Sequence, residues 1–246
     1  MRHFATLRRS LGLLASFPDE QRDPDRFYTN LAEDTAELIA LFAPVAGDRI
    51  LDVGGGPGFF DAAFAHRGAW YLGVDPFEKS QVRASGHALP FADNTFDITY
   101  SSNVVEHVAN PWDMCSEMLR VTRPGGVAII SYTIWLGPFG GHETGLWQHY
   151  VGGEFARDRY TRLHGHPPKN SFGTSLFNVS CAEGLRWARG VRDAQVIKVF
   201  PRYHPWWAWW LVHVPLLREF LVSNLVVVLK KSPIAHCATG DLTAIL

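Results

Sequence analysis

Glycine recurs at alternate positions in residues 52–58, which read D-V-G-G-G-P-G and so have the form D-x-G-x-G-x-G. Because glycine carries no side chain, a loop of this kind lets the backbone come close to a ligand at a strand-to-helix turn. The dinucleotide fingerprint G-x-G-x-x-G is a competing interpretation, but its last position falls on Phe59 or Asp61. The loop is therefore a candidate ligand cradle, and the alternative is a tight connection that binds nothing.

An acidic residue, Asp75, ends the next apolar segment, about 20 residues beyond the glycine loop. A carboxylate at the carboxyl end of a second parallel strand can accept both hydrogen bonds of a ribose diol. The loop and Asp75 together predict a site for a ligand that contains a ribose. The alternative is that Asp75 caps the amino terminus of a following helix.

Two pairs of glutamate and histidine supply the candidate groups for proton transfer. Glu106 and His107 follow a predicted strand, and His142 and Glu143 lie in the glycine-rich stretch 137–143. Polar pairs in loops at strand tips are well placed for an active site, and histidine titrates near neutral pH. We therefore take His142, Glu143 and His107 as candidate catalytic residues. The alternatives are a structural role for the first pair and a surface loop, capped by His142, for the second.

Short apolar segments alternate with amphipathic segments along the chain, which predicts a doubly wound α/β fold. Strands are expected at 50–53, 71–75, 96–100, 127–132, 195–200 and 224–229; helices are expected at 5–16, from Asp23-Pro24 onward, at 59–66, 112–121 and 154–164, and from the capping box at 180–183 to Gly190. A turn is expected at 123–126. This alternation indicates a mostly parallel sheet with both faces covered and with its ligand site at the carboxyl ends of the strands.

The chain of 246 residues is predicted to form one domain, because a hydrophobic content of 47% is enough for an ordered core. Residues 1–46 are expected to form N-terminal helices, 47–133 the ligand-binding half, 134–179 a lid inserted over the strand tips, and 180–246 the C-terminal half. The net charge of -1 argues against nucleic acid as a substrate. The three cysteines are widely spaced and odd in number, so no disulfide framework is expected and the cytoplasm is the default location.

Tryptophan is concentrated in the segment 205–216, which holds Trp206, Trp207, Trp209 and Trp210. Tryptophan is common in buried caps and dimer interfaces, and it also favours the headgroup region of a membrane. The segment is too short to span a bilayer, which requires about 20 apolar residues. Docking on the inner face of the plasma membrane is therefore one interpretation, with anionic lipid contacted by Arg202, Arg218, Lys230 and Lys231. Burial in the core or in a dimer interface is the other.

The order and spacing of the motifs over about residues 45–133 resemble the class I S-adenosylmethionine-dependent methyltransferases, and more closely their ubiquinone/menaquinone-biosynthesis-like (type 11) group. The resemblance implies a Rossmann-like sheet of seven strands with S-adenosylmethionine as the cofactor. The motifs that carry it are Ile50 to Gly58, Gly73-Val74-Asp75, Ala88-Leu89-Pro90-Phe91, Phe96-Asp97, Val105-Glu106-His107-Val108, and Leu119-Arg120-Val121 through Pro124-Gly125-Gly126.

The resemblance also implies which residues contact the cofactor. Gly54, Gly56 and Gly58 are expected at its methionine portion, Asp75 at the ribose and Phe77 at the adenine. Relatives usually place an acid at the adenine amine, but here that position is Ser85. The backbone of the adjacent segment is expected to take this role, through Gly86, His87, Ala88 and Leu89. The other expected cofactor contacts are Asp52, Asn103 and Tyr28, of which Tyr28 either closes over the cofactor or only packs on its own helix.

Methyl transfer requires that the acceptor atom, the methyl group and the leaving sulfur be aligned, and a general base can remove the acceptor's proton. No metal is expected, because relatives with a metal site have an acid where this chain has Asn103. The motif of enzymes that methylate base amines is also absent at 101–104. The expected acceptor is a small or lipid-linked molecule, methylated at oxygen or carbon, as in envelope glycolipid or isoprenoid metabolism. The alternative is a cofactor-binding partner or sensor protein that has lost catalysis.

Overall fold

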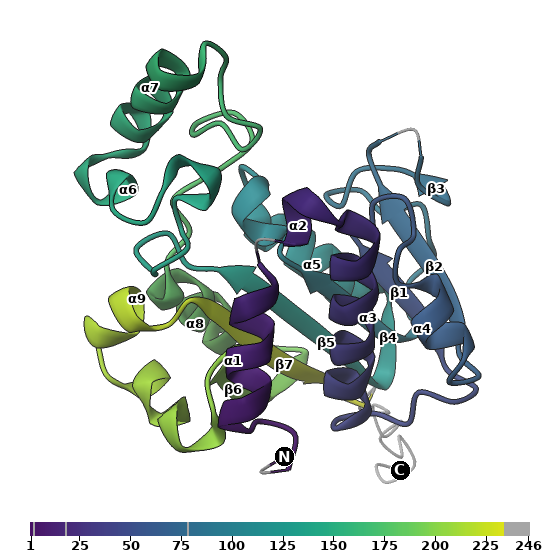
Figure 1. The fold of residues 1–246 in the computed structure, drawn as a ribbon. Coiled ribbons are helices and arrows are strands. Elements are labelled where there is room, and N and C mark those ends of the chain that lie inside the picture. Colours follow the sequence, from purple (N-terminus) through teal and green to yellow (C-terminus); the bar gives the residue numbers. More distant parts are fainter. Residues whose placement is uncertain (2, 18, 78, 234–246) are drawn as a thin grey trace, which may run out of the picture.

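The computed structural model describes residues 1, 3–17, 19–77 and 79–233, and it contains a seven-stranded sheet (Figure 1). Cys237 and the end of the predicted C-terminal half lie outside the described residues. The strand order is β3-β2-β1-β4-β5-β7-β6; β7 runs antiparallel to both of its neighbours, and the other pairings are parallel. The strands are β1 (Arg49–Val53), β2 (Trp70–Asp75), β3 (Val82–Arg83), β4 (Phe96–Ser102), β5 (Thr122–Thr133), β6 (Ala194–Pro201) and β7 (Asn224–Lys231). The predicted fold class is therefore confirmed.

Helices cover both faces of this sheet, and each face has its own apolar core (Figure 1). On one face, α3 (Pro24–Ala40) and α4 (Asp61–Ala65) pack on β1, β2 and β4, with α1 (Leu7–Ser16) and α2 (Asp19–Arg22) beside them. On the other face, α5 (Pro111–Val121) and α8 (Cys181–Gly190) pack on the alternate side chains of the same strands. The glycine loop follows the carboxyl end of β1, between these two helical layers.

Side-chain caps fix the first residues of two predicted helices, α3 and α8. Asp23 accepts a hydrogen bond from the backbone of Arg26 at 3.3 Å, with Pro24 in the first turn of α3. The predicted capping box of α8 is complete, because Ser180 and Glu183 each bond the backbone N–H of the other. These contacts satisfy amide groups that the first turn of a helix leaves unpaired.

Two parts of the sheet differ from the sequence prediction. β3 has only two residues, too few for an alternating pattern to reveal it. Residues 123–126 belong to β5 rather than to a separate turn, although Gly125 has a φ of 77° and the register with β4 shifts there. The reason is close packing, since a Cβ at Gly126 would lie 2.6 Å from the carbonyl oxygen of Asp97 on β4.

The predicted insertion 134–179 leaves the carboxyl end of β5 and stands clear of the sheet (Figure 1). It contains η2 (His142–Thr144), α6 (Gln148–Val151) and α7 (Gly153–His164). The backbone of Phe177 returns to donate to the carbonyl of Glu106 at 2.8 Å, and Trp135 donates to Val179 at 2.9 Å. We call residues 134–179 the lid segment.

The tryptophan-rich segment forms η3 (Trp206–His213), which is followed by α9 (Leu217–Leu221). Arg202, just before it, is a buried residue rather than the lipid-facing cation that the sequence suggested. Its guanidinium donates to Thr35 at 2.6 Å and to Ser102 at 2.7 Å. Arg202 therefore ties α3 to the sheet. None of the helices in the described ranges is long and apolar enough to cross a bilayer.

Candidate active site

The glycine loop has the open geometry of a ligand cradle. Gly54, Gly56 and Gly58 have φ values of 88°, 53° and 87°, a region that side chains strain. A Cβ built at Gly54 would collide with Val104, so packing alone requires glycine there. A Cβ built at Gly56 or Gly58 meets no atom within 4 Å. These two residues therefore border free space that a ligand can fill.

Asp75 is held at the edge of this space by two backbone amides. Its carboxylate accepts from Gly56 at 3.2 Å and from Phe77 at 3.1 Å, and the residue is buried. In the described part of the chain, the next element after Asp75 is β3 and not a helix, so the capping alternative does not apply. Each carboxylate oxygen keeps a further lone pair, and these can accept from a ribose diol.

Aromatic side chains flank the loop on two sides. Phe77 is 73% exposed at the end of β2, which leaves its ring free to cover a planar group. Tyr28 of α3 stacks on Phe59 with ring centroids 4.6 Å apart and an interplanar angle of 5°. Since Phe59 follows Gly58 directly, this stack brings the start of α3 alongside the loop.

The segment expected at the adenine has few free backbone donors. The amide of His87 donates to the Ser85 hydroxyl at 3.2 Å, and that of Ala88 donates to the Ser85 carbonyl at 3.1 Å. The amide of Leu89 donates to Glu117 at 3.0 Å. Ser85 thus folds its own segment into a turn.

Two other expected contacts lie close to this turn or to the sheet beside it. Gly86 packs closely against Met114. A Cβ built at Gly86 would lie 2.8 Å from the Met114 side chain. Asn103 lies at the end of β4 with a φ of 56°, and its Oδ1 accepts from Asn224 at 2.8 Å. Its side chain is thereby fixed in orientation at the carboxyl edge of the sheet.

Asp52 lies beneath the loop. Its carboxylate is buried and accepts from the hydroxyl groups of Tyr71 at 2.8 Å and Tyr100 at 2.6 Å. Burial raises the pKa of Asp52 to about 7, although both tyrosine hydrogen bonds act to lower it. A Cβ at Gly55 would lie 2.8 Å from Asp52 Oδ2. The side chain therefore supports the loop from below, enclosed by the core.

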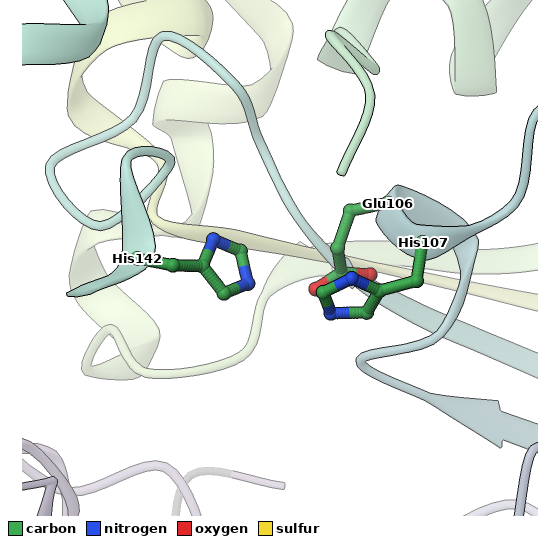
Figure 2. A group of neighbouring side chains, drawn as sticks. All are labelled: Glu106, His107 and His142. Carbon is green, nitrogen blue, oxygen red and sulfur yellow. The ribbon is translucent and has the colours of Figure 1, made fainter. Parts of the chain in front are cut away.

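The structure brings two of the three candidate catalytic residues together. His107 belongs to the short turn η1 (Val105–His107) after β4, and His142 opens η2 of the lid segment. Their ring centroids are 5.1 Å apart. Figure 2 shows the His142 ring extending from its loop toward His107 and Glu106. Glu106, which the sequence analysis treated only as a neighbour of His107, joins this group.

Glu143 faces a different partner. Its carboxylate accepts from the backbone amide of Asn170 at 2.7 Å and from the side-chain amide of Asn170 at 2.9 Å. These hydrogen bonds lower the pKa of Glu143, against the effect of its burial. Glu143 therefore joins two parts of the lid segment.

A surface hollow elsewhere in the molecule does not coincide with this site. It is lined by Asp93, Arg120 and Lys231, at the amino-terminal end of the parallel strands. Lys231 already donates there to the carbonyls of Leu119 at 2.7 Å and Arg120 at 3.0 Å. The glycine loop and Asp75 lie at the opposite end of the sheet, where doubly wound folds bind ligands.

A sheet of this order, with a glycine loop after β1 and a buried acid at the end of β2, defines a methyltransferase of the Rossmann-like class. Residues 51–130 match a family described as a methyltransferase domain. The chain is 58% identical over 245 residues to an uncharacterized methyltransferase of Mycobacterium tuberculosis, covering 92% of this chain and 95% of the relative. It is 59% identical over 246 residues to one of Mycobacterium marinum, with 92% and 95% covered.

Solved structures share the fold. An S-adenosylmethionine-dependent methyltransferase from Mesorhizobium loti is similar with a TM-score of 0.54 and 21% identity, covering 81% of this chain and 98% of that chain. Another from Aquifex aeolicus has a TM-score of 0.50 and 16% identity, with 87% and 96% covered. The chain belongs to the methyltransferases. Its residues 51–130 match the methyltransferase domain of the type 11 family model, and its cofactor is S-adenosylmethionine.

Proposed function

We propose that this methyltransferase acts on a lipid-linked or small-molecule acceptor, at oxygen or carbon, beneath the lid segment. The observation that carries the proposal is the position of His107 and His142, whose rings lie 5.1 Å apart between the strand tips and the lid. A polar pair there can orient an acceptor against the cofactor or take its proton.

The glycine loop and its surroundings fit the cofactor. Gly56 and Gly58 border free space, Asp75 offers two carboxylate oxygens, and the Phe77 ring is exposed. We assign the methionine portion to the loop, the ribose to Asp75 and the adenine to the Phe77 side. When bound, S-adenosylmethionine supplies a methyl group on a positively charged sulfur. The new bond to the acceptor forms as the carbon–sulfur bond breaks, and S-adenosylhomocysteine leaves.

The proton balance assigns a task to the histidines. An acceptor hydroxyl or activated C–H loses one proton for each methyl group gained. A neutral imidazole can take that proton. The Glu143–Asn170 contact supports this arrangement, because it fixes the lid loop that carries His142.

An exposed apolar surface supports a lipid-linked acceptor. Trp206, Trp207 and Trp210 of η3 are all exposed, at 42%, 57% and 55%. The surface continues onto α9 through Phe220, whose ring lies 6.3 Å from that of Tyr150 in the lid segment. We call η3, α9 and α6 together the apolar surface. A patch of this kind marks an interaction site, and interfacial aromatic groups favour a membrane.

Not every residue named for membrane binding belongs to the apolar surface. Trp209 stacks on Phe200 with centroids 4.4 Å apart and donates its Nε1–H to the carbonyl of His204 at 3.1 Å. Lys230 and Lys231 lie at the far end of β7, since residue 225 at its other end pairs with Pro201 just before η3. Membrane binding is therefore expected to depend mainly on apolar contacts.

Transfer of a labelled methyl group tests the proposal. Purified protein would be incubated with methyl-labelled S-adenosylmethionine and a total extract of the source organism, separated into lipid and water-soluble fractions. We expect label in the lipid fraction. The labelled species should be heavier by one methylene than the unmethylated precursor that accumulates in a deletion strain. Label confined to the water-soluble fraction would refute a lipid-linked acceptor, and label in neither fraction would refute both acceptor classes.

A further inference from the structure

Three side chains with available ligand atoms converge where the lid segment meets the tip of β4. They are Glu106 and His107 of η1 and His142 of η2 (Figure 2). One ligand atom from each lies within 4.8 Å of those of the other two. The sequence led to the expectation of no metal, because Asn103 replaces the acid of relatives with a metal site. We infer instead that Glu106, His107 and His142 form a binding site for a divalent transition-metal ion.

Both histidines are held in the tautomer that a metal ligand requires. Nδ1 of His107 donates to the carbonyl of Ser175 at 2.6 Å, and Nδ1 of His142 donates to the carbonyl of Gly140 at 3.2 Å. Because a carbonyl oxygen can only accept, each Nδ1 carries the proton and each Nε2 carries a lone pair. Metal-binding histidines are fixed in this way, with the other ring nitrogen bonded to a carbonyl or carboxylate.

Glu106 supplies an independent observation. The residue is only 1% exposed. Its Oε1 accepts from the backbone amide of Thr133 at 3.0 Å, while its Oε2 is buried with no hydrogen-bond partner among the described residues. A buried carboxylate oxygen without a partner is costly, and a cation beside it removes that cost. Glu106 contributes one carboxylate oxygen to the same cluster as the two histidines.

The ligand set indicates the class of metal. Two imidazole nitrogens and one carboxylate suit Zn²⁺, Fe²⁺, Mn²⁺ or Co²⁺, whereas Mg²⁺ and Ca²⁺ prefer oxygen ligands. Ligand atoms at about 2.1 Å from a tetrahedral ion lie about 3.4 Å apart. The cluster therefore has to contract when the ion binds. His142 is on the lid segment, so a metal ion would draw this segment toward η1.

Three protein ligands leave at least one coordination position open. An acceptor hydroxyl or carbonyl oxygen can occupy it, and a metal ion lowers the pKa of a hydroxyl that it binds. This role rests on the proposed function, because it assumes that the acceptor lies at the histidine pair. The metal site itself does not depend on that assumption, and it can be tested without cofactor or acceptor.

Titration of chelator-treated, tag-free protein with Zn²⁺ by calorimetry, and with Co²⁺ by visible absorption, tests the site. We expect one ion per chain in the wild type. Metal affinity should fall by about 100-fold in each of the variants Glu106→Gln, His107→Ala and His142→Ala. Changing a residue that only supports a metal ligand already costs up to about 100-fold in affinity, so removing a ligand should cost at least as much. His66→Ala, which removes an exposed histidine at the end of α4, should bind the ion as the wild type does.

Glu106→Gln affects a buried residue, so His142→Ala in the lid is the decisive variant if the former does not fold. Hydrogen exchange in the lid segment should slow when Zn²⁺ is added to the wild type and should not change in His142→Ala. Equal affinity in the wild type and in folded His107→Ala and His142→Ala would overturn the site. Metal binding without any methyl transfer would leave the site standing and refute only the proposed function.

Discussion

At the scale of single residues, Asp75 is expected to carry a large part of cofactor affinity. Its carboxylate is already positioned by the amides of Gly56 and Phe77. Asp75→Ala should weaken binding of S-adenosylmethionine by about 1.5–3 kcal/mol, the range for hydrogen bonds to a charged group. Calorimetry measures this, with the exposed Asp113→Ala as the matched control. Unchanged affinity in a folded Asp75→Ala protein would contradict the ribose assignment.

Gly56 gives a prediction of a different kind. Gly56→Val should abolish detectable cofactor binding and leave the protein folded. A Cβ at Gly56 meets no protein atom within 4 Å, so the added methyl groups would occupy ligand space, and a φ of 53° adds a modest strain. Circular dichroism and calorimetry on the same sample separate folding from binding. Normal binding by this variant would show that the loop is not the cradle.

The raised pKa of Asp52 predicts how the stability of the fold depends on pH. Burial raises its pKa from 3.8 to about 7, so the folded state holds the proton more tightly than the unfolded chain does. Its contribution to stability is therefore complete below pH 4 and is lost as the pH rises to 7. Between these pH values, each increase of one pH unit lowers the free energy of unfolding by about 1.4 kcal/mol.

Asp52→Asn cannot titrate and should remove this slope. Urea unfolding of the wild type and the variant at pH 4.5, 5.5, 6.5 and 7.5 measures the difference. Asp113→Asn, at an exposed position on α5, controls for the loss of one charge. Parallel curves for wild type and Asp52→Asn would mean that Asp52 is ionised throughout this window in the folded protein.

The residues proposed for the cofactor site could be selected from the sequence because their signals are local. The glycine spacing and Asp75 lie within about 25 residues of chain, and one strand-loop-helix unit positions them. The role of Asp52 was harder to predict, because Tyr71 and Tyr100 come from two other strands. The cluster of Glu106, His107 and His142 was not predictable, since the path of the lid segment decides which side chains meet.

At the scale of elements, the lid segment links the site to the rest of the chain. His142→Ala should lower turnover by about 100-fold or more, whether the imidazole takes a proton or binds a metal. Cofactor affinity should change little, because the glycine loop is on a different element. His164→Ala at the end of α7 is the matched control. A comparable loss in His164→Ala would indicate general damage to the lid.

Element boundaries followed the sequence where short-range chemistry determines them. The caps of α3 and α8 formed as predicted, because each needs only two residues in one turn. The extent of β5 through 123–126 and the existence of β3 depend on hydrogen bonds to neighbouring strands. A single segment's composition does not contain that information, so these two elements required the structure.

At the scale of the whole molecule, the tryptophans divide into two groups that the sequence could not distinguish. Trp209 packs into the core and bonds to a backbone carbonyl, whereas Trp206, Trp207 and Trp210 are exposed on the same helical segment. Four apolar residues of one type carry no pattern that reveals which of them faces inward. The division provides a test that separates membrane docking from folding.

The wild type is expected to float with liposomes through the apolar surface. Replacing Trp206, Trp207 and Trp210 together by Ser should abolish flotation with little change in the melting temperature, because surface substitutions cost little. Trp209→Ser should do the opposite, since it leaves a cavity against Phe200 and an unpaired His204 carbonyl. Flotation should respond weakly to salt, because Arg202 is buried and Arg218 is paired with Glu219. If the triple variant unfolds or changes its oligomeric state, and the wild type does not float, the apolar surface is a protein interface instead.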